Sequence, residues 1–171
     1  MSSTPRLRGR GVRLEPLSTA HAAPMEHVLA DAGLYEFIGG SPPSPADLEA
    51  RYARQVAGPR GAVFAWHTWI IRLVDGDEPV GYVQATVNGD DSVAELAWVV
   101  GMPWQGRGIA SDAASAVVEF VDACGVERVI AHVHPGHVAS QRVAARLGLV
   151  PTPRIVDGEV EWEARSATRG R

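Results

Sequence analysis

Residues 93–110 read VAELAWVVGMPWQGRGIA, and the pattern of apolar residues changes inside this stretch. Val93 to Val100 combine β-branched, aromatic and small apolar side chains, a composition that fits a pleated strand. From Gly108 onward apolar residues recur at helical spacing opposite a polar stripe. These apolar positions are Ala110, Ala114, Val117, Val121 and Cys124. The stretch therefore predicts a strand that passes through a glycine-rich loop into a long amphipathic helix.

Upstream of this stretch the sequence predicts an antiparallel meander. Two further apolar runs, Ala65 to Val74 and Val80 to Val87, precede the strand at Val93. Asp75-Gly76-Asp77 separates the first pair of runs and Asn88-Gly89-Asp90 the second. Asn-Gly or Asp-Gly between apolar runs is the strongest short hairpin signal. Three consecutive strands are therefore expected.

The N-terminal third of the chain predicts a strand and two helices. Val12 to Pro16 is expected to form the strand, and Leu17 to Ala32 a helix that starts late or kinks at Pro24. A second helix is expected to begin behind Ser44 as its N-cap and to run to about Ala57.

Downstream of the central helix the chain alternates again between strand and helix. Arg128 to Val133 predicts a strand, and Ala139 to Leu147 a short helix closed by Gly148. Leu149 to Trp162 is expected to hold one or two final strands. The whole order places helices on a mixed sheet, which is an α/β (α+β) single domain.

Length and composition limit the class of protein. The 171 residues are enough for one domain, 1–171, with a core over about residues 12–162 and flexible arginine-containing tails. The net charge of −4 argues against nucleic-acid binding. No apolar run approaches the roughly 18 residues of a membrane span, and no signal peptide is recognisable. A soluble, cytoplasmic protein is expected, with the single cysteine, Cys124, packed in the core.

The loop from Trp104 to Ala110 is a candidate anion site. It leads from a strand into a helix, so its backbone N–H groups are the unpaired donors of a helix N-terminus. Gly106 and Gly108 remove side chains that would block a phosphate, and Arg107 could add positive charge. A glycine-rich turn of this kind also occurs without a ligand. The third glycine of a dinucleotide fingerprint and the Gly-Lys-Ser/Thr of a P-loop are both missing.

Two motifs in this order resemble a known family. Gln105-x-x-Gly108-x-Ala110 looks like the acetyl-CoA pyrophosphate motif of the GNAT superfamily of N-acetyltransferases. About forty residues later, residues 137–148, HVASQRVAARLG, resemble that superfamily's Asn-x-x-Ser-x-Arg-x-x-x-x-Leu-Gly element. The resemblance covers roughly Val12 to Trp162 and is nearest to the branch of ribosomal-protein and small-molecule N-acetyltransferases. It implies a GNAT-like bent mixed sheet of six to seven strands flanked by four helices.

The resemblance also implies a cosubstrate and a place for it. Acetyl-CoA (coenzyme A) is expected, without a metal. The strand from Glu95 to Gly101 would splay away from the parallel strand Arg128 to Val133, and the pantetheine arm would lie in the gap. The residues expected to contact the cofactor are Val99, Val100, Gln105, Gly106, Arg107, Gly108, Ile109, Ala110 and His137.

Glu95 is the candidate general base. An amine attacks a thioester only when unprotonated, and for a lysine-like pKa of about 10.4 this costs about 4.6 kcal/mol at pH 7. Glu95 lies in the segment AELAW, at a position similar to the family's active-site glutamate. A strand glutamate that faces solvent or pairs with an arginine is the alternative interpretation.

The general acid is less clearly defined. A thiol with a pKa of about 8.5 leaves without much need for a proton donor. Many family members carry a tyrosine where this chain has Ala144, so the usual acid is missing. Ser140 is the candidate substitute, and its alternative role is to cap the helix N-terminus.

In the family, the first two helices and the strand ends recognise the acceptor. Tyr35, Phe37, Tyr52 and Trp69 are therefore the candidate acceptor-binding residues, while the other tryptophans are expected to pack in the core or in hairpins. The expected reaction is direct attack, in a ternary complex, by a primary amine of a small molecule or of a protein or peptide N-terminus. A homodimer is compatible with folds of this kind, although no sequence feature demonstrates one.

Two other functions stay open at this stage. One is a catalytically weak acyl-CoA-binding sensor module, for which the missing tyrosine at Ala144 is the motive. The other is a metal-binding protein built on His132, His134 and His137, of which the first two share one face of a strand. These histidines could equally be cofactor contacts or ordinary strand and turn residues.

Overall fold

The computed structural model describes residues 3–61 and 63–165 of the chain. Its centre is an eight-stranded mixed sheet with the order β1-β2-β3-β4-β5-β6-β8-β7. All neighbouring strands are antiparallel except β5 and β6. The strands are β1 (Leu7–Arg8), β2 (Val12–Pro16), β3 (Phe64–Leu73), β4 (Pro79–Asn88), β5 (Val93–Val100), β6 (Arg128–Val133), β7 (Val150–Val156) and β8 (Glu159–Arg165).

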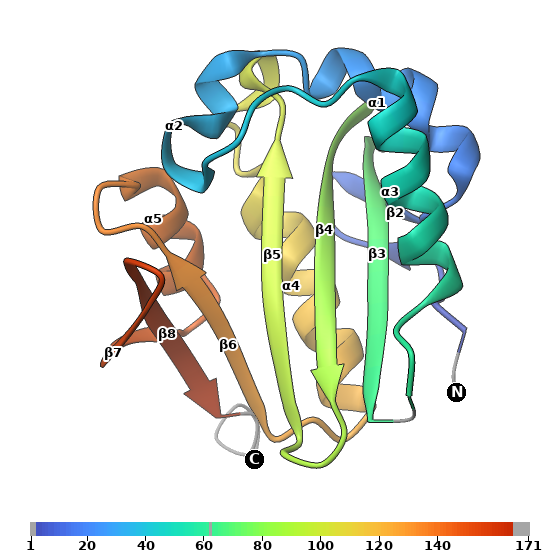
Figure 1. Cartoon of the computed structure of the whole chain (residues 1–171). Coiled ribbons are helices and arrows are strands. Elements are labelled where there is room, and N and C mark those ends of the chain that lie inside the picture. Colours follow the sequence, from blue (N-terminus) through green and yellow to red (C-terminus); the bar gives the residue numbers. More distant parts are fainter. Residues whose placement is uncertain (1–2, 62, 166–171) are drawn as a thin grey trace.

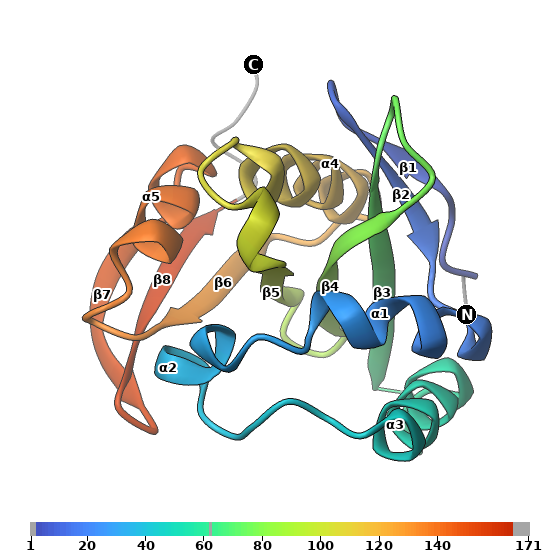
Figure 2. The same ribbon diagram turned by 90° about the horizontal axis from the view of Figure 1, so that it is seen from above.

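Helices cover both faces of this sheet. Figures 1 and 2 show α4 and α5 behind the sheet and α1, α2 and α3 in front of it. The helices are α1 (Ala22–Val28), α2 (Tyr35–Ile38), α3 (Pro45–Ala57), α4 (Ile109–Ala123) and α5 (Val138–Arg146). The predicted α/β class and the predicted meander β3-β4-β5 are confirmed, whereas the described residues hold more strands and helices than expected.

The main core lies between the sheet and α4. Ile109, Ala113, Val117 and Val121 of α4 are buried there against the inner side chains of the strands. The helix is confirmed, and Ala114, Val117 and Val121 are buried as predicted, whereas Ala110 is only partly buried. Cys124 is exposed at the C-cap, so the expectation that it packs in the core is wrong. The chain turns away at Gly125, before another helical turn could bury the thiol.

A smaller core lies on the front face under α1 and α3. Met25, Leu48 and Tyr52 pack there against Ile70 of β3. The predicted start of α3 is confirmed, since the Ser44 hydroxyl accepts the Asp47 amide at 3.1 Å and Pro45 is the first helical residue. These two helices cover one end of the front face.

The helix expected over Leu17 to Ala32 is only partly correct. Thr19–His21 forms a 3-10 turn, and α1 covers no more than Ala22–Val28. The Ser18 amide donates to the ring of His21, which starts the turn ahead of the helix. Pro24 lies in the first turn of α1, where its missing N–H is not needed. The four residues of α2 were not predicted, because so short an element shows no periodicity.

The N-terminal arginine-rich segment is not a flexible tail in the described part of the chain. β1 pairs with β2, and the Trp69 indole N–H donates to the Pro5 carbonyl oxygen at 2.6 Å. The Asp112 carboxylate of α4 accepts the backbone amides of Arg10 and Gly11 at 2.9 and 2.7 Å. The expected C-terminal tail, from residue 166 onward, lies outside the described residues. No helix within the described ranges is long and apolar enough to span a membrane.

The strands β5 and β6 pair only at one end. Their parallel register comprises Val93 with Arg128, Ala94 with Val129 and Glu95 with Ile130. Beyond Glu95 the two strands diverge, as Figure 1 shows at the carboxyl end of β5. The splay expected at this place is therefore present in the sheet, and it opens a space on the front face.

Candidate active site

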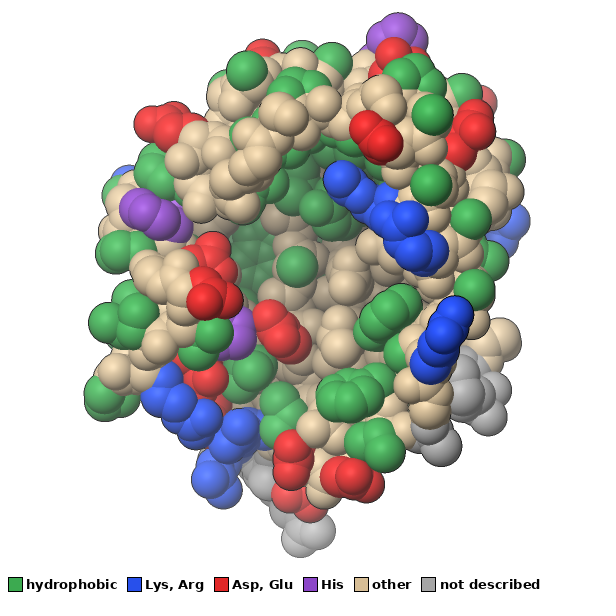
Figure 3. All heavy atoms as spheres, in the orientation of Figure 1, with side chains coloured by type: hydrophobic (Ala, Val, Ile, Leu, Met, Phe, Trp, Pro, Cys, Tyr) green, Lys and Arg blue, Asp and Glu red, His purple; other side chains and the backbone are tan. Residues whose placement is uncertain are grey.

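A cleft of about 280 Å³ lies where β5 and β6 diverge. Figure 3 shows it as a hollow in the front face, with apolar side chains on its floor and acidic and histidine side chains beside it. The residues around it come from α2, β4, β5, β6 and α5 and include Phe37, Tyr82, Glu95, Val99, His132, His137 and Ser140. Residues far apart in the sequence are thus brought to one opening.

Glu95 points to the front face from the last position of β5 that pairs with β6. Its side chain is 50% exposed, which leaves one side of the carboxylate accessible. The register places Thr86 of β4 beside Glu95, and Trp66 of β3 beside Thr86. Because directly paired residues point to the same face, these three side chains form one row across the sheet. The half-exposed ring of Trp66 ends this row.

His132 and Glu161 lie on the other side of Glu95. The Nδ1 atom of His132 is 2.9 Å from Glu95 Oε1, and its Nε2 atom is 3.6 Å from Glu161 Oε2. Glu161 belongs to β8 and is 4% exposed. Sequence analysis had placed His132 only among three spaced histidines, and it gave no sign of Glu161 because the pairing of β6 with β8 is not visible in a single sequence.

The loop before α4 has the geometry of an anion cradle. Gly106 and Gly108 both have φ of +76°, a conformation that L side chains rarely adopt. A Cβ built on either glycine would meet no atom within 4 Å, so the space beside the loop is open. The first helical hydrogen bond runs from the Asp112 amide to the Gly108 carbonyl oxygen at 3.0 Å. The amides of Ile109, Ala110 and Ser111 therefore precede the helical ladder, and these groups fit a pyrophosphate.

The remaining residues of the predicted cofactor site differ in whether their side chains or only their backbone groups are accessible. Val99 lines the cleft. The Val100 carbonyl accepts the Gln105 side-chain amide at 2.9 Å, so Gln105 links the loop to the end of β5. Arg107 is exposed beside the glycines, whereas the Ile109 side chain is buried in the core and leaves only its backbone amide for the loop.

His137 and Ser140 flank the cleft at the start of α5. His137 is the N-cap, and its Nδ1 accepts the Ser140 amide at 3.4 Å. Ser140 is therefore not the cap, and that alternative role is wrong. Ser140 is one of the residues that line the cleft. Burial, helped by the nearby His134, lowers the pKa of His137. Its ring stacks on Phe37 at 4.6 Å between centroids, which joins α2 to α5 across the opening.

Of the predicted acceptor residues, only Phe37 lines the cleft. Tyr35 is half-buried and donates its hydroxyl to the Leu29 carbonyl at 2.9 Å. Tyr52 is buried under α3, where its hydroxyl has no partner, and burial raises its pKa. Trp69 is 0% exposed in the main core behind the sheet, so its prediction as an acceptor residue is wrong. It points backward because strand side chains alternate.

Trp66 and Tyr82 are aromatic residues on the front face that were not among the predicted acceptor residues. Trp66 is 38% exposed on the face of Glu95, although it was expected to pack in the core or a hairpin. Tyr82 lines the cleft from β4, and burial raises its pKa. Side chains alternate along a strand, so Trp66 and Trp69 must lie on opposite faces of the sheet. Knowing one buried residue of β3 would have shown which of the two is buried.

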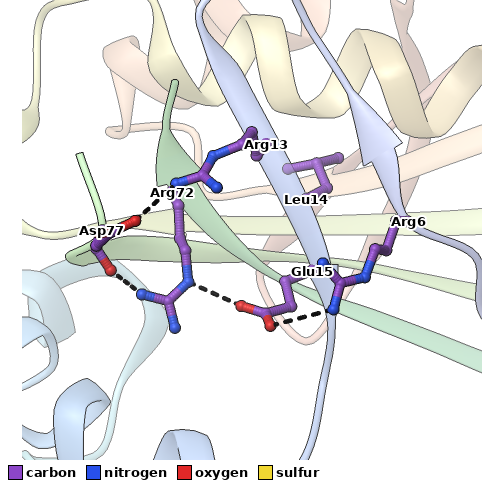
Figure 4. Close-up of a pocket in the computed structure, with 6 residues that line it drawn as sticks. All are labelled: Arg6, Arg13, Leu14, Glu15, Arg72 and Asp77. Carbon is purple, nitrogen blue, oxygen red and sulfur yellow. Dashed lines mark hydrogen bonds and ion pairs between the residues drawn. The ribbon is translucent and has the colours of Figure 1, made fainter. Parts of the chain in front are cut away.

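A second cavity, of about 330 Å³, lies away from the cleft on β2 and β3. Figure 4 shows that its charged side chains pair with one another: Arg72 and Arg6 reach Glu15, and Arg13 reaches Asp77. The hydrogen bond from Arg72 lowers the pKa of Glu15. This cavity is a network of ion pairs that joins the first strands, and it offers no unpaired reactive group.

The three histidines do not gather around one point. His132 contacts carboxylates of β5 and β8, whereas the Nδ1 atom of His134 accepts the Gly136 amide at 2.9 Å. Within residues 3–61 and 63–165, no group of three His, Cys, Asp or Glu side chains could hold a metal ion.

Comparison with known proteins identifies the family. The sequence model of the Acetyltransferase (GNAT) domain matches residues 12–150. The chain belongs to the GNAT acetyltransferase family. It is therefore an acyltransferase, and the GNAT domain accounts for most of the chain. None of the curated protein sequences compared with it matches.

Solved structures share this fold at low sequence identity. A GNAT-family acetyltransferase from Bacillus anthracis is 15% identical, with a TM-score of 0.78, over 95% of this chain and 99% of that one. The microcin C7 self-immunity acetyltransferase MccE, in complex with acetyl-CoA and AMP, is 13% identical with a TM-score of 0.77, over 91% of this chain and 93% of that one. RimL, a ribosomal L7/L12 α-N-protein acetyltransferase in complex with coenzyme A, is 14% identical with a TM-score of 0.77, over 94% of this chain and 98% of that one.

Proposed function

We propose that this GNAT domain transfers an acetyl group from acetyl-CoA to a primary amine by direct attack in a ternary complex. The observation that carries the proposal is the opening between β5 and β6, which brings Glu95 into a cleft at the end of the strand that leads to the Gly106–Gly108 loop. MccE and RimL, which share the fold, were solved with acetyl-CoA and coenzyme A, respectively.

The cofactor would be held by backbone groups rather than by charged side chains. The amides from Gly106 to Ala110 would bind the pyrophosphate at the N-terminus of α4, with Arg107 adding positive charge. Val99 and Val100 would border the arm, and His137 would contact it from α5. Open space beside both glycines supports this assignment.

Each catalytic role follows from where the side chain lies. Acetyl-CoA supplies the acetyl group as a thioester, whose carbonyl carbon the amine attacks and whose thiol leaves. Glu95 takes a proton from the ammonium group, directly or through a water, and so leaves the nitrogen lone pair free. Ser140, in the wall of the same cleft, assists departure of the thiol by donating its hydroxyl hydrogen.

The acceptor is proposed to cross the front face on its way to Glu95. Phe37 and Ile38 lie on one side of the cleft, and the row that ends at Trp66 leads to Glu95 from the other. Small amines and protein N-termini both fit an opening that is accessible along the sheet.

The test is release of coenzyme A thiol from acetyl-CoA with a panel comprising tyramine, spermidine, free lysine and a peptide with an N-terminal serine. Glu95→Gln is expected to lower kcat by about 100-fold or more with the best amine, since a positioned base contributes about that factor. Glu163→Gln, which changes a glutamate of β8 that pairs with Arg128 and Arg165 and does not line the cleft, is the matched control and should stay near wild type. The sequence contains no lysine, so acetylation of the enzyme's own lysines cannot contribute to the signal.

A second function, an acyl-CoA-binding sensor with weak catalysis, is favoured by one observation. Ala144 is fully buried, so no tyrosine hydroxyl reaches the cleft from that position. The two functions differ in turnover. Tight binding of acetyl-CoA with no thiol release from any amine, and no effect of Glu95→Gln, would support the sensor.

A further inference from the structure

We propose that His132 and Glu161 are positioning residues that hold the Glu95 carboxylate in the orientation needed for proton transfer. This inference rests on the proposed role of Glu95 as the general base. It gives a function to the buried carboxylate of Glu161 on β8, which takes no part in the proposed cofactor and acceptor sites.

The sheet itself brings the three side chains together. Glu95 is the last residue of β5 that pairs with β6, opposite Ile130. His132 follows Ile130 on the same face of β6, at the point where the strands begin to diverge. On its other side β6 pairs with β8, and the register sets His132 directly opposite Glu161. The imidazole is therefore held between two strands at the mouth of the cleft.

The contact with Glu95 determines which nitrogen of the His132 ring carries hydrogen. An ionised carboxylate only accepts, so a His132 Nδ1 to Glu95 Oε1 distance of 2.9 Å requires hydrogen on Nδ1. The Nε2 atom faces the Glu161 carboxylate at 3.6 Å, which is beyond hydrogen-bond distance. The ring therefore donates to Glu95 from Nδ1 and presents its opposite edge to Glu161.

Burial makes Glu161 an unusual residue for a purely structural role. Its side chain is 5% exposed and its Oε1 atom has no hydrogen-bond partner. Arg154 of β7 approaches that oxygen to 3.6 Å but is itself largely exposed. A buried carboxylate is costly unless it is paired, and His132 is the buried partner that this one faces. The titratable and charged groups around His132 are thus Glu95 from β5 and Glu161 from β8, with Arg154 from β7 behind Glu161 and His134 just past the end of β6.

The two oxygens of Glu95 have different roles. Oε1 is engaged by His132, so Oε2 is left to accept the proton of the amine. The proton moves from nitrogen to Oε2, and no bond to His132 breaks in that step. Loss of His132 removes this hydrogen bond, and loss of Glu161 removes the carboxylate against which the ring lies, so the half-exposed carboxylate of Glu95 can rotate away from the amine.

Kinetics test the role with matched variants. His132→Gln and Glu161→Gln are each expected to lower kcat roughly tenfold with the best amine of the panel, a part of the factor of about 100 or more that a positioned base contributes. KM for acetyl-CoA should stay the same, so the loss should appear in kcat and not in cofactor binding. Glu163→Gln makes the same change on the same strand, where the carboxylate pairs with Arg128 and Arg165, and should behave as wild type.

A double variant separates this inference from the proposed function. If His132 acts through Glu95, adding His132→Gln to Glu95→Gln costs little further activity, because the group being positioned is already gone. Normal kcat in His132→Gln and Glu161→Gln, with Glu95→Gln inactive, would overturn the inference and keep the base. An active Glu95→Gln would overturn the proposed function instead.

A readout without turnover uses nitrogen-15 spectra of the histidine rings in the full chain. The signal that His132→Gln removes should show hydrogen on Nδ1 in the wild type, because this nitrogen donates to Glu95 Oε1. A ring that carries its hydrogen on Nε2 alone contradicts the inference. If Glu161→Gln fails to fold, the wild-type spectrum and the His132→Gln kinetics still decide it.

Discussion

Trp66 and Trp69 lie close together on β3 and point to opposite faces of the sheet. Trp69 contacts Phe120 edge to face at 5.6 Å between ring centroids and fills the core behind the sheet. Trp66 ends the row of Glu95 and Thr86 on the open face. One aromatic residue therefore stabilises the fold, and the other is available to an acceptor.

The two tryptophans predict opposite results. Trp69→Ala should lower the free energy of unfolding by about 3–5 kcal/mol, because it empties a large buried site. Trp66→Ala should cost less than about 1 kcal/mol but raise KM for the acceptor. Urea unfolding and steady-state kinetics with the best amine measure the two effects. Equal stability losses in both variants would refute the assignment of the faces.

At this scale the sequence predicts chemistry better than orientation. Glu95, Ser140 and Phe37 were predicted from the resemblance, and the structure brings them to one cleft. Trp69 was assigned wrongly and Glu161 was missed. Which face a strand residue occupies depends on packing partners that lie far away in the sequence, and these are not visible in local patterns.

Among the elements, β2 is tied to its neighbours by Glu15. Its carboxylate accepts from Arg72 of β3 at 2.8 Å, and His21 approaches it to 3.3 Å. The hydrogen bond from Arg72 lowers the pKa of Glu15 below the model-compound value of 4.5. The ionised form is thus favoured by folding.

Glu15→Gln should lower the stability of the protein in a pH-dependent way. A lowered pKa in the folded state gives stability that is present above the unfolded pKa and is lost as pH falls through the folded pKa. The variant should therefore be less stable by up to about 1 kcal/mol at pH 7, because the pair is partly exposed, and should approach wild type in acid. Urea titrations from pH 7 to pH 3 measure this difference. A deficit that stays constant over that range would contradict the assignment.

The cap of α3 gives a second test at the level of elements. Ser44→Ala removes the oxygen that accepts the Asp47 amide and should cost about 1 kcal/mol. Ser41→Ala, in the exposed loop before it, is the control. Thermal melting of both variants decides the point, and equal melting temperatures would argue against the cap.

The elements best predicted from the sequence are those with strong local signals. Ser44-Pro45 marked the start of α3, and the Asp-Gly and Asn-Gly turns marked the meander, because cap and turn geometry depend on neighbouring residues. The division of residues 17–38 into short turns and helices was not predicted. Contacts with β3 and β4 stabilise α1, and Phe37 of α2 packs on His134 and His137; local periodicity reports neither set of contacts.

For the molecule as a whole, one continuous sheet joins the first described strand to the last, and we propose that the chain folds as a single domain. The sheet is incomplete at one place, the divergence of β5 from β6. The resemblance predicted that opening, and the sequence alone could not have done so. Backbone hydrogen bonds between two parallel strands leave no residue pattern that marks where they stop.

Calorimetric titration with desulfo-CoA tests the central claim, that this opening and the loop before α4 form a coenzyme A site. Wild type should bind with micromolar affinity, and Gly108→Trp should not, because its side chain fills the open space at the loop. Gly125→Trp has the same positive φ and the same open surroundings at the far end of α4, so it matches the backbone strain and should bind normally. Failure of the folded wild type to bind, or equal binding by Gly108→Trp, would contradict the account.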